Sequence, residues 1–189
     1  MRIIRALLVM SSTITWAAGC ATAPPPTSTG YSSSLSLCKT RVSNAPQVDR
    51  RGRIANFQAT TRVRGVVLAR APVDGCLSSG FGRRFGGAGS IHKGIDLYTG
   101  QARDIIAAGP GRVVQIGRQS GFGRTILIEH RNGVATRYAH LSSYAPRLKS
   151  GDRVAAGTVI GRTGASGNAT GVHLHYEILV NGRAIDPLR

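Results

Sequence analysis

The chain has 189 residues, 41% of them hydrophobic, which suits one folded domain with accessory segments and excludes a wholly disordered chain. Its 25 glycines and low aromatic content of 5% favour short strands and tight turns over a helical bundle. The formal net charge of +17 comes mainly from arginine and favours polyanionic partners, but no nucleic-acid-binding module occurs in the sequence, so we expect no nucleic acid among them.

Residues 1–19 have the pattern of an export signal, with two early arginines and an apolar stretch too short and too polar for a transmembrane helix. The stretch ends in Ala-Ala-Gly-Cys at residues 17–20, which resembles the lipobox of bacterial lipoproteins, although Ala17 stands where leucine is usual. The resemblance implies a lipid anchor on Cys20. By resemblance to Gram-negative lipoproteins, Ala21 after the cysteine implies the periplasmic face of the outer membrane rather than inner-membrane anchoring or secretion. An ordinary signal peptide cut nearby is the alternative.

Residues 20–38 are rich in Ser, Thr and Pro and are predicted to form a flexible tether. Residues 39–71 are rich in arginine, and their pattern leaves two interpretations open, an extra strand that wraps the domain or a mobile segment. If Cys20 carries a lipid, Cys38 and Cys76 remain, and two cysteines in an exported protein predict a disulfide. Two free thiols are the alternative.

Residues 72–189 contain a series of short apolar runs separated by turn signals such as Asn132-Gly133. The pattern predicts an all-β domain of antiparallel strands, a β-sandwich of two packed sheets with a site in a groove between loops. The loop at 164–171 is expected to form one wall of that groove. The predicted strands lie at 112–116, 125–129, 134–138, 158–162 and 173–180.

Four of the five histidines fall in three clusters, and His130 lies outside them. We interpret His130, which follows an alternating run, as a strand-end or surface histidine. The last cluster begins a run of period two, so His173, His175 and Glu177 share one face of a strand. The intervening residues of that run are apolar and are expected to pack in the core.

The first cluster places His92 and Asp96 on either side of a Lys-Gly turn, which can bring both side chains toward one point. With His175 they supply two imidazoles and one carboxylate. Three protein ligands with an open fourth position are typical of catalytic zinc, so the sequence predicts one zinc ion per chain. We interpret Glu177 as a hydrogen-bond partner of a ligand rather than as a ligand.

The three clusters, in this order, resemble the lysostaphin-type family of zinc metallopeptidases, also called LytM-like or glycyl-glycine peptidases. Its pattern is His-x3-Asp, a later lone His and a terminal His-x-His, and the Ser-Gly-Phe-Gly-Arg stretch at residues 79–83 also matches. The resemblance covers residues 72–189, the expected zinc peptidase domain. It implies zinc on His92, Asp96 and His175. It also implies that His140 and His173 are catalytic, acting on the water and the transition state, in an order that the sequence does not give.

Exported members of this family cut peptides in peptidoglycan. The resemblance therefore implies a zinc-dependent peptidoglycan endopeptidase of the bacterial cell wall, with D-alanyl-diaminopimelate cross-links as the expected substrate in a Gram-negative envelope. Cell-division or wall-synthesis proteins are further partners to expect.

Three other interpretations compete with hydrolysis, and the third, a nucleic-acid binder, rests on charge alone. The first is a non-catalytic or autoinhibited family member that binds the wall or activates other wall hydrolases, with residues 39–71 as a plug across the groove. The second is a carrier-type module, because residues 151–161 resemble the β-sandwich of lipoyl and biotinyl carriers. Neither Lys93 nor Lys149 lies in the modifiable motif of such carriers, and the histidines would have no purpose there.

Overall fold

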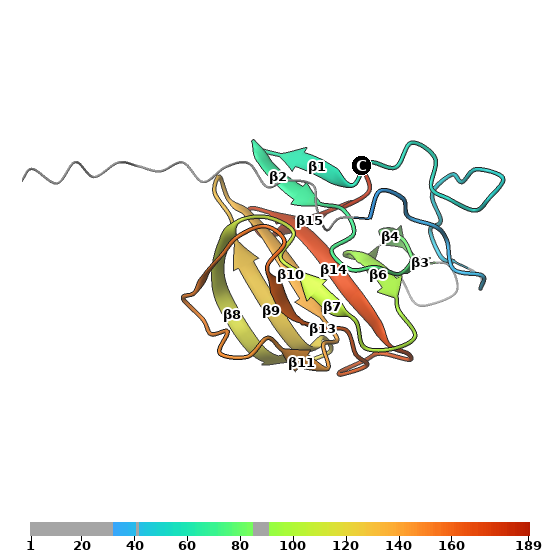
Figure 1. Cartoon of the computed structure of the whole chain (residues 1–189). Coiled ribbons are helices and arrows are strands. Elements are labelled where there is room, and N and C mark those ends of the chain that lie inside the picture. The colour runs from blue at the N-terminus through green and yellow to red at the C-terminus, as the bar shows by residue number, and fades with distance from the viewer. Residues whose placement is uncertain (1–31, 41, 85–90) are drawn as a thin grey trace, which may run out of the picture.

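The structure is a computed structural model of the chain, and it describes residues 32–40, 42–84 and 91–189. All regular secondary structure in these ranges is β-strand (Figure 1), and they contain no helix long and apolar enough to cross a membrane. The predicted signal peptide at 1–19, the lipidation site Cys20 and most of the tether lie outside the described residues.

An eight-stranded antiparallel sheet is the main layer of the fold (Figure 1). Its strand order is β12-β8-β9-β10-β14-β6-β3, and β15 pairs with β14. The strands are β3 (Cys76–Ser79), β6 (Ile95–Tyr98), β8 (Gly111–Gln119), β9 (Gly123–Glu129), β10 (Val134–Ala139), β12 (Arg153–Val154), β14 (His173–Val180) and β15 (Arg183–Ile185).

A three-stranded sheet of order β11-β13-β7 lies over one face of this layer (Figure 1). It consists of β7 (Asp104–Ile106), β11 (Ser143–Tyr144) and β13 (Val159–Arg162), and two hairpins complete the fold, β1 (Thr60–Val63) with β2 (Val66–Ala69) and β4 (Gly82–Arg83) with β5 (Ile91–His92). The core between the layers contains Ile105 and Ile160 from the small sheet and Ile126, Tyr138 and Tyr176 from the large one, all fully buried. The predicted antiparallel β-sandwich is confirmed.

The arginine-rich residues 39–71 pack on the domain. The β1–β2 hairpin contributes Leu68 and Ala69 to the core, and the Tyr176 hydroxyl donates to the Ala69 carbonyl at 2.9 Å. Before the hairpin, the chain runs beside β3 through the parallel bridges Leu37↔Leu77 and Ser43↔Ser79. The described part of this segment thus packs on the domain, with isolated bridges along the edge strand β3 of the large sheet.

The predicted disulfide between Cys38 and Cys76 is present and joins the segment beside β3 to β3 itself. It closes a loop with a sequence separation of 38 residues. We expect Cys38→Ser/Cys76→Ser to lower the free energy of unfolding by about 4 kcal/mol, because the open chain gains conformational entropy when unfolded. Urea unfolding measures the difference. Reductant should lower the unfolding free energy of the wild type to that of the variant and should leave the variant unchanged. Equal stability of both proteins without reductant would contradict the prediction.

His130 follows β9, as a strand-end histidine should, but it is only 6% exposed, so the interpretation as a surface residue is wrong. The Pro110 carbonyl lies 2.7 Å from His130 Nδ1, and the Thr136 hydroxyl lies 2.9 Å from Nε2. Burial lowers the pKa of His130 below its ordinary value of 6.5, against the opposing hydrogen bond to Pro110.

Because His130 binds its proton more weakly in the folded chain, the unfolded chain takes up the extra proton as the pH falls below about 6.5. The stabilisation by neutral His130 is thus complete above that pH and is lost on acidification. We expect the unfolding free energy of wild type to fall more between pH 7.5 and 5.5 than that of His130→Gln. Urea unfolding at both pH values gives this difference. The other histidines are the same in both proteins, so their contributions to the pH dependence cancel. Equal pH slopes would show that His130 does not contribute.

Candidate metal centre

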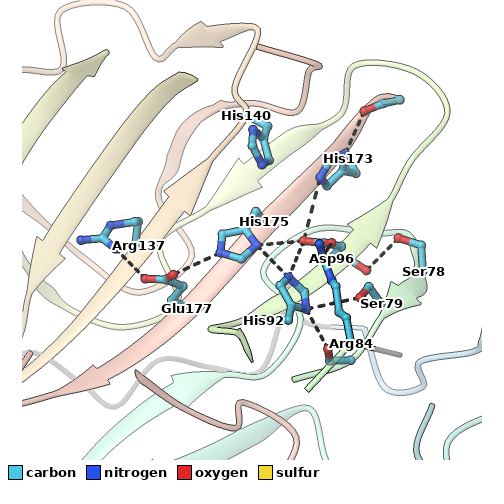
Figure 2. A network of polar contacts seen from close by, with 12 residues as sticks. Ser78, Ser79, Arg84, His92, Asp96, Arg137, His140, His173, His175 and Glu177 are labelled. Atoms are coloured by element: carbon cyan, nitrogen blue, oxygen red, sulfur yellow. Dashed lines mark hydrogen bonds and ion pairs between the residues drawn. The ribbon is translucent and has the colours of Figure 1, made fainter. Parts of the chain in front are cut away.

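Three side chains from three strands of the described chain converge on one point (Figure 2). His92 ends β5, Asp96 lies on β6, and His175 lies opposite Asp96 in the β6–β14 register. The Asp96 Oδ1 atom lies 3.1 Å from His92 Nε2 and 2.8 Å from His175 Nδ1, and the two ring nitrogens are 3.1 Å apart. All three residues are at most 9% exposed. The structure thus brings together the three residues that the sequence predicted to be metal ligands.

The turn between His92 and Asp96 requires glycine because it lies directly against β14. A Cβ atom at Gly94 would be 2.3 Å from the Tyr176 carbonyl oxygen, a separation that a real side chain cannot adopt. The absence of a side chain lets β5 and β6 approach β14 closely enough for their polar groups to meet His175.

The outer nitrogen of each ligand histidine has its own hydrogen-bond acceptor. His92 Nδ1 donates to the Gly80 carbonyl at 2.7 Å, and His175 Nε2 donates to Glu177 Oε1 at 3.2 Å. In the neutral rings, the inner nitrogens therefore carry lone pairs rather than protons. Two nitrogen lone pairs and a carboxylate oxygen then face one another at about 3 Å, an arrangement that repels itself without a cation at its centre.

The charges agree with this arrangement. Burial alone would raise the pKa of Asp96, but the hydrogen bonds that His175 and His92 donate when their inner nitrogens also carry a proton hold it well below the usual range, so the carboxylate is ionised. Burial would also lower the pKa of His175, yet the Asp96 and Glu177 carboxylates outweigh it and raise the pKa. In the absence of a metal, a proton on the cluster is thus favoured, as expected of a site that binds a positive charge.

The donor set fits a zinc ion. Donors at about 2.0–2.1 Å around a tetrahedral ion lie about 3.3 Å apart, close to the separations of the three inner atoms. Two imidazoles, one carboxylate and one side left open are the chemistry of catalytic rather than structural zinc.

A second layer of contacts supports the ligands (Figure 2). Arg84 Nη2 donates to Asp96 Oδ2 at 2.9 Å, and Arg137 Nη1 donates to Glu177 Oε2 at 2.7 Å. Glu177 is fully buried, and the Arg137 guanidinium lies 4.8 Å from the centre of the Phe122 ring. Glu177 thus has the supporting position that the sequence predicted.

The sequence reasoning did not identify Arg84, Arg137 or Phe122. The contact between Arg137 and Glu177 follows from the β10–β14 register, in which the two residues lie opposite each other. Both residues lie in predicted strands, but the register between two strands cannot be read from their patterns alone. Arg84 directly follows the Ser-Gly-Phe-Gly-Arg stretch that carried part of the family resemblance.

His140 and His173 lie on the open side of the cluster, with their ring centres 4.8 Å apart (Figure 2). His140 Nδ1 donates to the Ser166 carbonyl and His173 Nδ1 to the Gly171 carbonyl, each at 2.8 Å. In the neutral rings, each Nε2 is therefore a proton acceptor, and His173 Nε2 lies 3.9 Å from Asp96 Oδ1. Burial, with the charges of His173 and His175, outweighs the Ser166 hydrogen bond and lowers the pKa of His140, so its neutral form prevails at neutral pH.

His140 has a left-handed backbone conformation, with φ at 64°. A non-glycine residue in this region is held there by its surroundings. The His140 amide donates to the Phe122 carbonyl at 2.9 Å, and its ring is held by Ser166. This turn directs the ring into the cavity instead of continuing β10.

The cluster opens into a cavity of about 360 Å³. Asn168 and Thr170 confirm that the loop at 164–171 forms one wall, and the β8–β9 turn forms another. No described residue of 39–71 lines the cavity, so this part of the chain does not plug the groove. The full lining is Arg84, His92, Asp96, Gly121, Phe122, His140, Asn168, Thr170, His173 and His175.

Comparisons with known proteins agree with the geometry. Residues 90–187 match Peptidase family M23. The chain is 40% identical over 98 residues to the DD-carboxypeptidase/endopeptidase Mpg of Neisseria meningitidis, and the aligned region covers 52% of this chain and 22% of Mpg. It is 33% identical over 135 residues to the murein hydrolase activator NlpD of Salmonella typhimurium, covering 71% of this chain and 34% of NlpD. The chain thus spans about a third or less of these relatives.

Two solved structures have the same fold. A zinc-containing peptidase from Vibrio cholerae superposes with a TM-score of 0.59 and 29% identity, over 69% of this chain and 45% of that one. The catalytic domain of lysostaphin from Staphylococcus simulans gives a TM-score of 0.51 and 33% identity, over 57% of this chain and 85% of the lysostaphin chain. The predicted relationship to lysostaphin-type peptidases is confirmed.

Proposed function

The chain belongs to peptidase family M23, and from this premise we propose that it is a zinc-dependent endopeptidase that hydrolyses peptide cross-links in peptidoglycan. The observation that carries the proposal is the buried cluster of His92, Asp96 and His175, whose three inner atoms are all acceptors. These residues would hold one zinc ion per chain. Zinc in such a site acts as a Lewis acid and lowers the pKa of a bound water to about 7.

The chain's own residues would carry the proton transfers. His140 is suited to accept the proton of the attacking water, because its Nε2 is free and burial keeps the ring neutral. His173 lies beside it with its Nε2 3.9 Å from Asp96 Oδ1, and after taking up a proton from solvent it can donate to the oxyanion or to the leaving nitrogen. Ser166 and Gly171 keep the two rings aimed at the same volume.

Glu177 would strengthen the zinc site by holding His175. Its carboxylate fixes the tautomer of His175 and makes the inner nitrogen a better donor to a metal. We expect Glu177→Gln to weaken zinc binding about 10–100-fold, measured by competition with a chelating dye. Glu129→Gln, at an exposed glutamate, is the matched control and should leave the affinity unchanged. Equal affinities in both variants would refute the role of Glu177.

For the bond, we propose the D-alanyl-diaminopimelate cross-link, since the similarity to Mpg, named a DD-carboxypeptidase/endopeptidase, supports it. We also propose that the protein is a lipoprotein on the periplasmic face of the outer membrane. This rests on Cys20 and the Ser/Thr/Pro tether that follows it. Labelling with radioactive palmitate tests the anchor: the wild type should carry label, and Cys20→Ala should not.

The similarity to NlpD favours a second candidate function, a wall-bound activator of other hydrolases. An activator needs no metal ligands and no proton acceptors. The presence of the ligand cluster and of both His140 and His173 in one cavity favours catalysis.

Digestion of purified peptidoglycan tests the proposal. The zinc-loaded protein should convert cross-linked peptide dimers to monomers, as followed by chromatography and mass spectrometry, and a chelator should stop the reaction until zinc is restored. A protein that holds one zinc per chain and converts no dimers would overturn the peptidase and support the activator.

A further inference from the structure

A second groove, of about 660 Å³, lies away from the metal cluster and shares no lining residue with the first cavity. It is formed where the β1–β2 hairpin meets the ends of β8, β9 and β12. The metal cavity is lined by Gly121 and Phe122, just before β9, whereas this groove is lined by residues 129–131 at the other end of that strand. The seven residues of β9 separate the two sites by about 20 Å.

Four exposed arginines surround this basic groove: Arg62, Arg112, Arg131 and Arg153. Glu129 is the acidic residue among the lining residues, so the four arginines against one glutamate leave an excess of three positive charges. The floor between them is apolar and includes Val66, Val67 and Pro110.

The arginines of the groove differ from others in the described chain. Six arginines elsewhere form ion pairs with carboxylates, among them Arg84 and Arg137, but none of the ion pairs within the described residues involves one of the four in the groove. Arg131 donates to the Gly65 carbonyl at 3.0 Å, which fixes its position without neutralising its charge.

Two of these charges face each other across neighbouring strands. Arg153 is the direct partner of Arg112 in the β12–β8 register, and Arg112 is the partner of Glu129 in the β8–β9 register. Directly opposed side chains lie about 5 Å apart on the same face, and like charges in that position are destabilising. An anion bound between Arg112 and Arg153 would relieve this repulsion.

We propose that the basic groove binds a carboxylate-bearing peptide of the wall polymer and so holds the enzyme on peptidoglycan at a distance from the bond that it cuts. This inference rests on the proposed function for the identity of the polymer. Guanidinium groups bind carboxylates through paired hydrogen bonds, which lysine cannot form. The apolar floor suits the methyl groups and chain of a short peptide. A lipid surface is disfavoured because a planar bilayer does not enter a concave groove.

Co-sedimentation with purified, insoluble peptidoglycan on ice tests the inference with the full chain. Arg112→Gln/Arg153→Gln should bind at least about tenfold more weakly than wild type, because two charged hydrogen-bonding groups are lost. Arg118→Gln/Arg183→Gln removes the same charge from exposed arginines outside the groove and should bind within about twofold of wild type. Arg112→Lys/Arg153→Lys keeps the charge without the paired geometry and should fall between them. Circular dichroism melting curves confirm that all variants fold.

Two further measurements separate this inference from the proposed function. Hydrolysis of a soluble cross-linked peptide dimer should be unchanged in Arg112→Gln/Arg153→Gln, because the groove is remote from the metal cluster. If no form of the protein cleaves the dimer, the proposed function fails, while the binding comparison still decides the role of the groove.

Equal binding of the groove variant and its charge-matched control would overturn the inference and leave only a general basic field. A loss of binding to vesicles of phosphatidylglycerol and phosphatidylcholine, with binding to peptidoglycan intact, would overturn it in favour of a membrane contact.

Discussion

Replacing His175 by alanine is expected to remove both the zinc and all measurable hydrolysis of peptidoglycan. His175 supplies one of three inner donor atoms, and its loss leaves His92 and Asp96 facing an incomplete site. His92→Ala and Asp96→Ala should have the same effect, because two protein ligands hold zinc far more weakly than three. Zinc per chain is measured by atomic emission after dialysis, and hydrolysis by release of peptide monomers.

His130→Gln is the matched control, since it also removes a buried histidine but lies outside the cluster. It should keep one zinc per chain and the activity of the wild type. Intact zinc in all three ligand variants would show that the metal, if bound, is held elsewhere. Zinc loss in His130→Gln as well would indicate that the assay reports unfolding rather than ligation.

The metal cluster could be predicted because its residues lie in short local patterns. A period of two places His173, His175 and Glu177 on one strand face whatever the rest of the fold does. The Lys-Gly turn brings His92 and Asp96 together within five residues. What joins these two local units is the pairing of β6 with β14, which places Asp96 opposite His175. The sequence supplied this pairing only through the resemblance to a known family.

The long strands of the large sheet were also predictable, because β8, β9, β10 and β14 have clear alternation between turn signals. The short strands β3, β6 and β7 were not, since three or four residues carry too little pattern to distinguish a strand from a loop. The burial of His130 was equally inaccessible, because the Pro110 carbonyl that contacts its ring is 20 residues away in sequence.

The structure of residues 39–71 was also not predictable from local sequence. Their composition suggested a solvent-exposed or mobile segment as readily as a packed one. In the structure, the contacts that hold this segment are distant in sequence: the disulfide Cys38–Cys76 at its start and the packing of Leu68 into the core. Such contacts depend on the whole fold, so local composition does not determine them.

Replacing His140 or His173 by alanine should reduce the rate of peptide hydrolysis by about 10²-fold or more while zinc stays bound. Neither ring contributes an atom to the three-donor cluster, and each is held by a backbone carbonyl of its own. The two variants therefore separate proton transfer from metal binding, which the ligand variants cannot do. Single-turnover kinetics on a soluble cross-linked dimer, with zinc content measured on the same samples, provide the comparison.

The double variant His140→Ala/His173→Ala gives the sharper test of whether the two histidines work together. Their rings are 4.8 Å apart and face one cavity, so they are expected to act on the same reacting groups. Residues that act as a unit are strongly non-additive, so the double variant should be slowed much less than the product of the two single losses. Multiplicative losses would mean that the histidines act independently. Full activity in either single variant would remove that histidine from the mechanism and leave its partner as the proton acceptor.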